Sequence, residues 1–521
     1  MAITAAAITP NREPALVKGR SFTPADVRLY GICDLLTGGL FCLAVIFSPW
    51  AFGTTEPWSV WTMNGCGYLL GLFLTIKIAL RNLKAYQPPR WDPPRGLPSV
   101  PSFSGRVSLQ RVLVFLTIGI VSYCVVSALN ARSTFHAAEL SFTYHSHLRW
   151  LPSSCDGSSS WFAFWTSLGF GCFFWAICDW LLGKSTREQA AAPVAGAGEF
   201  RELLPVRLHI LLWLLAVNGA LLGLEGLVQR LAGNGELLFF MKPRFNPEAI
   251  TQFGPYAYRG NAAQYFNLLW PVCLGFWWSL SHLHKSRRKA HHLLLACAAI
   301  MAICPLASTS RGGALITIGL LLTTMTFLVV RHFLSATRRH ENSAANGWAL
   351  ILILLFGFAV GAIGWVLGWK TLKPRLLQIQ QDLQYREQMY AKAKPITADY
   401  PIFGTGPGTF ENVFQLYRGS VDTYWPAQLH NDWLETRITF GWIGTILLAI
   451  AFLTVAARPF FPGGIPASGS FLFFVLLAFA GLLLHARFDF PFQVHSIVFL
   501  FLLLCSMLFT LSRDPISTHE K

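Results

Sequence analysis

Long apolar segments alternate with short polar segments along almost the whole chain. Runs of roughly 20 apolar residues are long enough to cross a bilayer as helices, because a helix satisfies its own backbone hydrogen bonds. The pattern predicts about twelve spans, at residues 30–50, 58–80, 112–129, 161–182, 208–228, 262–280, 293–308, 314–330, 347–369, 440–457, 471–486 and 497–511. We therefore expect an all-α fold, a polytopic transmembrane helical bundle.

One long polar segment interrupts this pattern between the ninth and tenth spans. Its apolar residues between 372 and 390 recur at intervals of three and four, which predicts an amphipathic helix over residues 372–392. Pro395 and Pro401 are expected to end that helix. A further helix is expected to begin near His430 and to run into the tenth span. The segment is thus predicted to form one large, partly helical loop outside the bilayer.

The distribution of Lys and Arg gives the orientation. With the N-terminus inside, the inside segments hold 24 of these residues and the short outside loops hold 8. Basic residues collect on the cytoplasmic side, so this orientation is expected. The predicted organisation begins with a cytoplasmic tail (1–29) and spans 1–9 (30–369). An external, catalytic loop (370–437) follows, and the chain ends with spans 10–12 (438–511) and a second cytoplasmic tail (512–521). In a bacterial inner membrane the loop would be periplasmic.

Composition supports a membrane protein and argues against nucleic acid as a partner. Hydrophobic residues make up 53% of the chain, charged residues only 13%, and the mean hydropathy is +0.46. A soluble domain carries about 25% charged residues. The net charge of +16 is explained by cytoplasmic loops and contact with anionic lipid headgroups. The eleven cysteines include no C-x-x-C pair, and only Cys155 lies in a predicted loop, so a disulfide between loops is not expected.

Three polar residues at the outer ends of predicted spans are candidates for chemistry. Arg259 precedes the sixth span, Arg311 lies between the seventh and eighth, and His430 precedes the tenth. Arginine beside the apolar core is costly unless an anion or carboxylate neutralises it, and its guanidinium binds phosphate through two hydrogen bonds. Each has a simpler alternative. Arg311 could extend to the membrane interface, as is also expected of Lys77, and His430 could bond only to backbone.

The order of four motifs resembles the O-antigen ligase and polymerase superfamily of membrane glycosyltransferases. These motifs are GPYAYRGNAAQYFNL, STSRGG at the start of a span, PIFGTGPGTF, and HNDWLE leading into FGWIG. The resemblance covers about residues 210–500. It implies a lipid diphosphate donor, usually undecaprenyl diphosphate, that carries a glycan. In one common form of the family, an asparagine and a histidine directly follow the first arginine. In this chain Gly260 and Asn261 follow Arg259 instead.

The resemblance also implies roles for individual residues. Arg259 and Arg311 would hold the diphosphate, and His430 would activate the acceptor hydroxyl. The expected substrate-binding residues are Arg386, Tyr258, Asn261, Gly404, Gly406, Gly408, Asn431 and Glu435. The three glycines have a simpler interpretation as a plain turn.

The residue types suit this chemistry independently. A diphosphate leaving group gains negative charge in the transition state, and fixed arginines aimed at that charge stabilise it. The chain contains no D-x-D motif of the kind that holds a metal in many glycosyltransferases, so a metal-independent enzyme without a cofactor is expected. A histidine accepts a hydroxyl proton readily near neutral pH. Asp432, Glu435 and Asp489 are each possible partners that orient His430.

The leading hypothesis is an O-antigen ligase-like enzyme that moves a glycan from a lipid-linked donor to a hydroxyl on a lipid, glycan or protein. A polysaccharide polymerase or a protein O-oligosaccharyltransferase is an alternative within the superfamily. A transporter or flippase of lipid-linked sugars would need charged residues along a path through the bilayer and repeated halves. A non-catalytic assembly protein would not need His430 together with two arginines.

Overall fold

The computed structural model describes residues 22–92, 101–185, 188, 204–243, 252–283, 289–338, 343–419 and 426–513. Most of both predicted tails lies outside these residues. Within them, nine helices are long and apolar enough to cross a membrane. They are α1 (Pro24–Trp50), α2 (Pro57–Leu83), α3 (Pro101–Leu129), α4 (Gly157–Leu181), α6 (Val206–Ala232), α8 (Leu293–Ala307), α9 (Arg311–Arg338), α10 (Ser343–Leu377) and α13 (Asp432–Ala457). The prediction of an all-α polytopic membrane protein is confirmed.

Three further helices coincide with the remaining predicted spans: α7 (Arg259–Leu283), α14 (Gly469–His485) and α15 (His495–Thr510). The last two are apolar but shorter. Helix α7 is long and carries several polar side chains, yet residues 260–280 are buried throughout. Neighbouring helices rather than lipid surround α7, so its polar groups can find partners. Asn267 donates to the carbonyl of Gly313 (3.0 Å) and accepts from the hydroxyl of Thr317 (2.7 Å), which ties α7 to α9.

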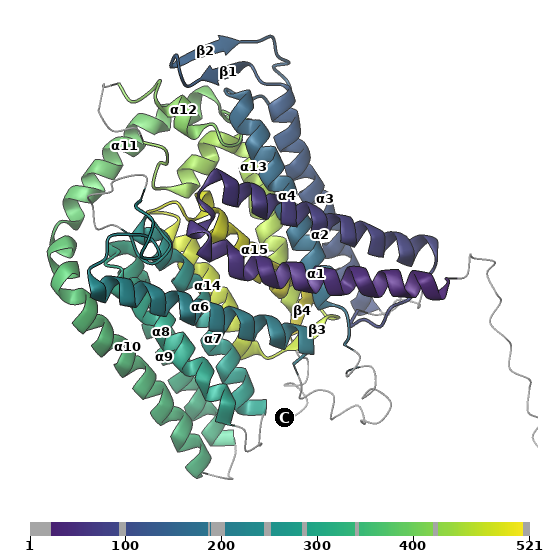
Figure 1. Cartoon of the computed structure of the whole chain (residues 1–521), viewed down its shortest axis with the longest axis vertical. Coiled ribbons are helices and arrows are strands. Elements are labelled where there is room, and N and C mark those ends of the chain that lie inside the picture. The colour runs from purple at the N-terminus through teal and green to yellow at the C-terminus, as the bar shows by residue number, and fades with distance from the viewer. Residues whose placement is uncertain are drawn as a thin grey trace, which may run out of the picture.

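The helices form two groups that meet at α15. In one group α7 packs against α6, α8, α9 and α14, and α10 covers α8 and α9. In the other group α2 and α4 pack together with α1 and α3 beside them. Helix α15 contacts α4, α7 and α13, so it joins the two groups (Figure 1).

The polar segment after α10 differs from its prediction. Helix α10 continues to Leu377. The helix is interrupted at Gln378, and α11 (Ile379–Asp399) follows directly. Pro395 was expected to end the helix, but α11 passes through it. Proline removes one helical hydrogen bond, and packing compensates here because Ala393 and Ile396 are fully buried in a small core with residues of α12 (Phe410–Phe414).

Short elements decorate the ends of the bundle. Strands β1 (Ser133–His136) and β2 (Ser141–Tyr144) form an antiparallel hairpin that the sequence pattern did not predict. We call the end of the bundle that carries this hairpin, α11 and α12 the α11 end (Figure 1). Strands β3 (Ile465–Ala467) and β4 (Leu511–Arg513) pair in parallel. Four short 3₁₀ helices complete the described elements, at Phe52–Thr54, Lys289–His292, Arg458–Phe460 and Pro491–Gln493.

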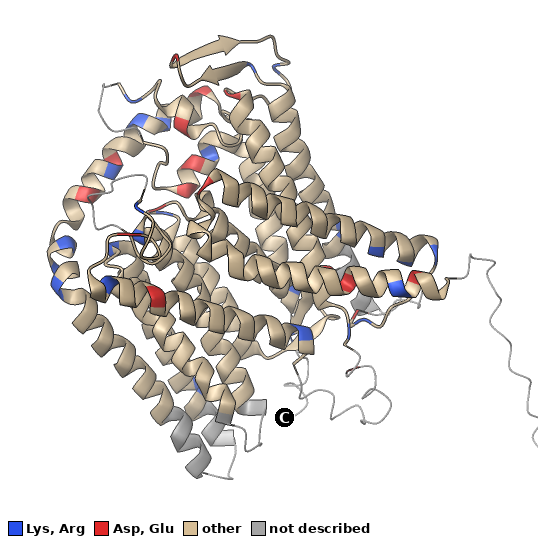
Figure 2. Ribbon diagram, in the orientation of Figure 1, with Lys and Arg blue, Asp and Glu red and all other residues tan. Residues whose placement is uncertain are grey.

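Charged residues lie mostly near helix ends and along α11 (Figure 2). Lys77 of α2 is an exception, and the expectation that it reaches the interface is wrong. Its side chain is fully buried, and Nζ lies 3.2 Å from Asp34 of α1 and 2.8 Å from Asp179 of α4. Two carboxylates neutralise the ammonium inside the bundle, so it has no need to reach water.

Candidate active site

His430 lies in a sharp turn directly before α13. Its backbone φ is +57°, a conformation that few non-glycine residues adopt. Asn431 caps α13, since its side-chain oxygen accepts from the amide of Leu434 (3.2 Å). The carbonyl of His430 accepts a hydrogen bond from the hydroxyl of Tyr390 in α11 (2.7 Å). The turn therefore fixes the backbone of His430 while its side chain remains 21% exposed.

Asp489 is the partner of the His430 ring. It lies in the loop between α14 and α15, and its Oδ1 is 2.9 Å from Nδ1 of His430. Burial raises the pKa of Asp489, but its hydrogen bond and charge interaction with His430 outweigh burial and hold the pKa below the usual value. An ionised carboxylate only accepts hydrogen bonds, so Nδ1 carries a proton, and in the uncharged form of the ring Nε2 is then the proton acceptor.

Tyr258 contributes a second hydrogen bond to this carboxylate. Its hydroxyl donates to Oδ2 of Asp489 (3.3 Å), and its ring stacks on Phe490 with centroids 5.4 Å apart. Burial and the neighbouring carboxylate raise the pKa of Tyr258, so it remains a donor. Both oxygens of Asp489 are thus engaged, and the carboxylate is held in one orientation.

The other two carboxylates that the sequence offered as partners of His430 build the surrounding backbone instead. Asp432 accepts from the amide of Phe492 (2.7 Å) and from the side chain of Gln493 (3.2 Å). Glu435 accepts from the amide of Leu429 (2.8 Å). The first carboxylate ties α13 to the loop that carries Asp489, and the second closes the turn before His430.

The two candidate arginines each begin a helix, Arg259 at α7 and Arg311 at α9. Arg311 forms an ion pair with Asp382 of α11 and donates to the carbonyl of Arg375 (3.2 Å). Arg230, Arg311 and Arg375 all lie within electrostatic range of Arg259. Neither Arg230 nor Arg375 was selected as a candidate from the sequence. Arg375 lay within the predicted amphipathic helix, and its position soon after a long apolar run was the one signal that could have indicated it.

The glycines that follow the two candidate arginines bring the starts of α7 and α9 against Asp489 and its neighbour His485. A Cβ atom on Gly260 would lie 2.8 Å from Oδ2 of Asp489, and one on Gly312 would lie 3.1 Å from Nε2 of His485. That nitrogen is 3.8 Å from Asp489 Oδ2. The helix starts that carry the two arginines therefore lie beside the His430–Asp489 pair, and the site draws on four separate parts of the chain.

Two other expected substrate-binding residues adjoin this site. Arg386 of α11 donates to the carbonyl of Phe488, next to Asp489. Asn261 lies in the first turn of α7 and is 5% exposed, and its Oδ1 has no hydrogen-bond partner among the residues that the structure describes.

The glycine turn braces α13. Gly404, Gly406 and Gly408 have φ values of +67°, +104° and +77°, which favour glycine. The amides of the first two donate to the carbonyls of Tyr400 (3.2 Å) and Thr439 (3.0 Å). These two amides already have acceptors in the protein, so the geometry gives the turn the role of positioning α13. The contact with Thr439 lies about two helical turns from His430.

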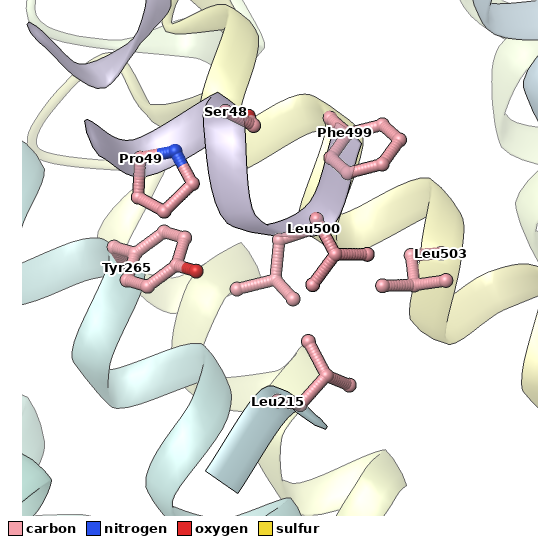
Figure 3. A pocket seen from close by; sticks show the side chains of 8 residues that line it. Ser48, Pro49, Leu215, Tyr265, Phe499, Leu500 and Leu503 are labelled. Carbon is pink, nitrogen blue, oxygen red and sulfur yellow. The ribbon is translucent and has the colours of Figure 1, made fainter. Parts of the chain in front are cut away.

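A separate crevice lies in the apolar interior, and none of these residues lines it (Figure 3). It has no room for a water molecule. Residues of α1, α6, α7 and α15 line it: Val45, Ser48, Pro49, Leu215, Tyr265, Phe499, Leu500 and Leu503. No charged residue lines it, so it does not suit an anionic or sugar ligand.

Fold and site together define a polytopic helical membrane protein with a cationic cluster beside a His–Asp pair at one end of its bundle. Residues 296–449 match the family model described as O-antigen ligase. The predicted resemblance to the O-antigen ligase and polymerase superfamily is confirmed, and the match supports a glycosyltransferase-like function. Arg311, Arg386 and His430 lie inside the matched region, whereas Arg259 and Asp489 lie outside it. A comparison with curated proteins finds no match.

Proposed function

We propose that the protein transfers a glycan from a polyprenyl diphosphate, such as undecaprenyl diphosphate, to an acceptor hydroxyl. The observation that carries this proposal is that the helix starts that bear Arg259 and Arg311 lie against the loop of Asp489, whose carboxylate bonds to His430. Guanidinium groups suit a diphosphate, and an imidazole that is oriented by an ionised carboxylate suits proton removal from a hydroxyl. The substrate-binding roles expected of Tyr258, Asn261 and Arg386 belong to the same proposal.

The reaction is a direct displacement. Nε2 of His430 takes the proton of the acceptor hydroxyl while the oxygen attacks the anomeric carbon. The bond from that carbon to the diphosphate oxygen breaks, and the diphosphate leaves with the electron pair, which inverts the anomeric centre. Arg259 and Arg311 stabilise the charge that develops on the leaving group. Asp489 stabilises the imidazolium that forms.

Activity is expected to be independent of divalent cations. The arginine cluster supplies positive charge where many glycosyltransferases use a metal. Transfer by the purified protein should proceed at an unchanged rate in EDTA. Loss of turnover in EDTA, with recovery on addition of Mg²⁺ or Mn²⁺, would contradict this expectation.

The reaction is proposed to occur at the outer face of a bacterial inner membrane, since the charge distribution directs the α11 end outward. The acceptor class is left to experiment: lipid A core, a growing glycan and a protein serine all present a hydroxyl. Ligase, polymerase and protein transferase therefore share the same chemical step.

A transfer assay with the purified full-length protein tests the proposal. The protein is mixed with a glycan-loaded polyprenyl diphosphate and each acceptor class in turn. Appearance of glycosylated acceptor together with unloaded polyprenyl diphosphate supports the proposal. Movement of intact donor across liposomes without any transfer would identify a flippase instead and overturn it.

A further inference from the structure

Three arginines from three helices meet at the turn between α8 and α9. Arg230 donates to the carbonyls of Gln252 (3.2 Å) and Ser308 (3.3 Å). Arg375 donates to the carbonyl of Thr309 (3.2 Å), and its own carbonyl accepts from Arg311 (3.2 Å). All three guanidinium side chains are half-buried. The turn therefore gathers like charges in a place where water screens them only in part.

These charges are poorly balanced by the protein. Of the three, Arg311 alone has a carboxylate within ion-pair distance in the described part of the chain, and that carboxylate is Asp382. Arg375 makes a single hydrogen bond there, which leaves most of its donors for a ligand. Partly buried like charges cost free energy unless an anion joins them. The cluster is thus arranged for an anionic ligand rather than for the stability of the empty protein.

The backbone of the turn adds an independent sign of function. Thr309 has a φ of +60°, which is strained for a β-branched residue. It is 2% exposed, and its hydroxyl has no hydrogen-bond partner among the described residues. Strained residues persist where the surrounding structure holds them, and they gather at ligand sites. A hydroxyl donor without a partner beside Arg375 and the first residue of α9 fits an incoming oxyanion.

We propose that Arg375 is a third donor-binding arginine, which joins Arg259 and Arg311 on the diphosphate, and that the diphosphate displaces Asp382 from Arg311. The proposal rests on the function proposed above. Arg230, which is tied to two carbonyls, positions the turn.

The chemistry of the leaving group explains why a third arginine is useful. A diphosphate that is linked at both ends carries one negative charge on each phosphate, and a further charge develops as the bond to the sugar breaks. Arg259 and Arg311 match the charges of the bound donor. Arg375 supplies positive charge for the further negative charge that develops on the diphosphate during the reaction.

Binding measurements on the full-length protein in detergent test the proposal, with polyprenyl diphosphate and polyprenyl monophosphate as probes. Arg375→Gln should weaken diphosphate binding about 10- to 100-fold, the usual cost of a charged hydrogen-bond partner, and should affect the monophosphate less. Asp382→Asn removes the competing carboxylate and should tighten diphosphate binding about fivefold. Arg437→Gln is the matched control, because Arg437 also donates to a backbone carbonyl, that of Pro401 (2.9 Å). It should bind like the parent.

The outcomes separate this inference from the proposed function. If Arg259→Lys and Arg311→Lys weaken diphosphate binding but Arg375→Gln does not, the inference is overturned and the proposed function stands. If the parent protein binds no polyprenyl diphosphate, the proposed function itself fails. Should Arg375→Gln unfold, as a lowered melting temperature without ligand would reveal, Arg375→Lys and Asp382→Asn decide the question. Parental affinity in both would overturn the inference.

Discussion

His430 is held by its backbone and by its ring at once. The carbonyl is fixed by Tyr390 (2.7 Å), Nδ1 by Asp489 (2.9 Å), and the ring packs edge-on against Phe490 with centroids 4.8 Å apart. A base that is already oriented loses little freedom when the acceptor binds, which lowers the barrier to proton transfer. The three contacts come from α11 and from the loop after α14, so the orientation of the imidazole depends on segments far away in the sequence.

Replacing Asp489 by asparagine should separate orientation from binding. Asp489→Asn keeps the size of the side chain but removes the charge that stabilises the imidazolium and selects the tautomer. The transfer rate should fall by ~10²–10⁴-fold, while binding of polyprenyl diphosphate stays near the parental value. Asp399→Asn is the control, because Asp399 accepts from the hydroxyl of Tyr417 (2.6 Å) at the far end of α11. A parental transfer rate in Asp489→Asn would show that the pair has no part in the chemistry.

The pH dependence of this carboxylate follows from the same contacts. The folded protein holds the pKa of Asp489 below its usual value. A lowered pKa stabilises the folded state above the ordinary range of an aspartate, about pH 4, and this contribution is lost as the pH falls through the folded value. Asp489 therefore stays ionised through the neutral range.

Candidate residues at helix ends could be chosen from the sequence. An ionisable side chain beside an apolar run costs free energy unless it has a partner or a function. Arg259, Arg311 and His430 became candidates in this way. Asp489 could not be separated from Asp432 and Glu435, because the pairing joins residues 59 positions apart and depends on tertiary packing. Arg375 was missed for a similar reason, since it becomes notable only when α9 and α10 bring it to Arg311.

Helix α11 connects both halves of the site. Asp382, Arg386 and Tyr390 recur every four residues and so share one face of the helix. They contact Arg311, the carbonyl of Phe488 and the carbonyl of His430, respectively. A helix was predicted here, but its ends were not, because the break at Gln378 and the passage through Pro395 depend on packing rather than on local pattern.

The glycine turn should be intolerant of any side chain. A Cβ atom on Gly404 would lie 2.5 Å from the amide nitrogen of Gly441 and from the carbonyl oxygen of Ile438, at a positive φ. Gly404→Ala should destabilise the protein by about 1–3 kcal/mol and lower transfer, because α13 and His430 would move. Gly361→Ala in α10 meets nothing within 4 Å and should melt at or above the parental temperature. Equal melting temperatures for the two variants would refute a bracing role.

Antiparallel connections between the helices bring the parts of the site together. The starts of α7, α9 and α13 and the loop between α14 and α15 all lie at the α11 end, although they span more than 200 residues of the chain. Apolar periodicity predicted every one of these helices, since backbone groups in lipid must be bonded within the segment. It could not predict which helices touch, because the lipid-like surface of one apolar helix resembles that of another.

The charge distribution predicts which end faces outward. A cysteine introduced at Gln384, which is exposed on α11, should react with a membrane-impermeant thiol reagent in intact spheroplasts. The parent chain gives the background, because its eleven cysteines are all buried or half-buried. Labelling that appears only after lysis would place the α11 end, and with it the site, in the cytoplasm.

Paired binding and transfer measurements on two variants test the division of labour most directly. His430→Ala should bind polyprenyl diphosphate almost as the parent does but transfer glycan ~10²–10⁴-fold more slowly, because it loses only the proton acceptor. Arg311→Lys should weaken binding and slow transfer together, because lysine keeps the charge but loses the two-pronged hydrogen bond. Melting temperatures of the solubilised variants exclude misfolding. Loss of donor binding in His430→Ala, or transfer by it at the parental rate, would contradict the proposed role of His430 as the base beside an arginine-lined diphosphate site.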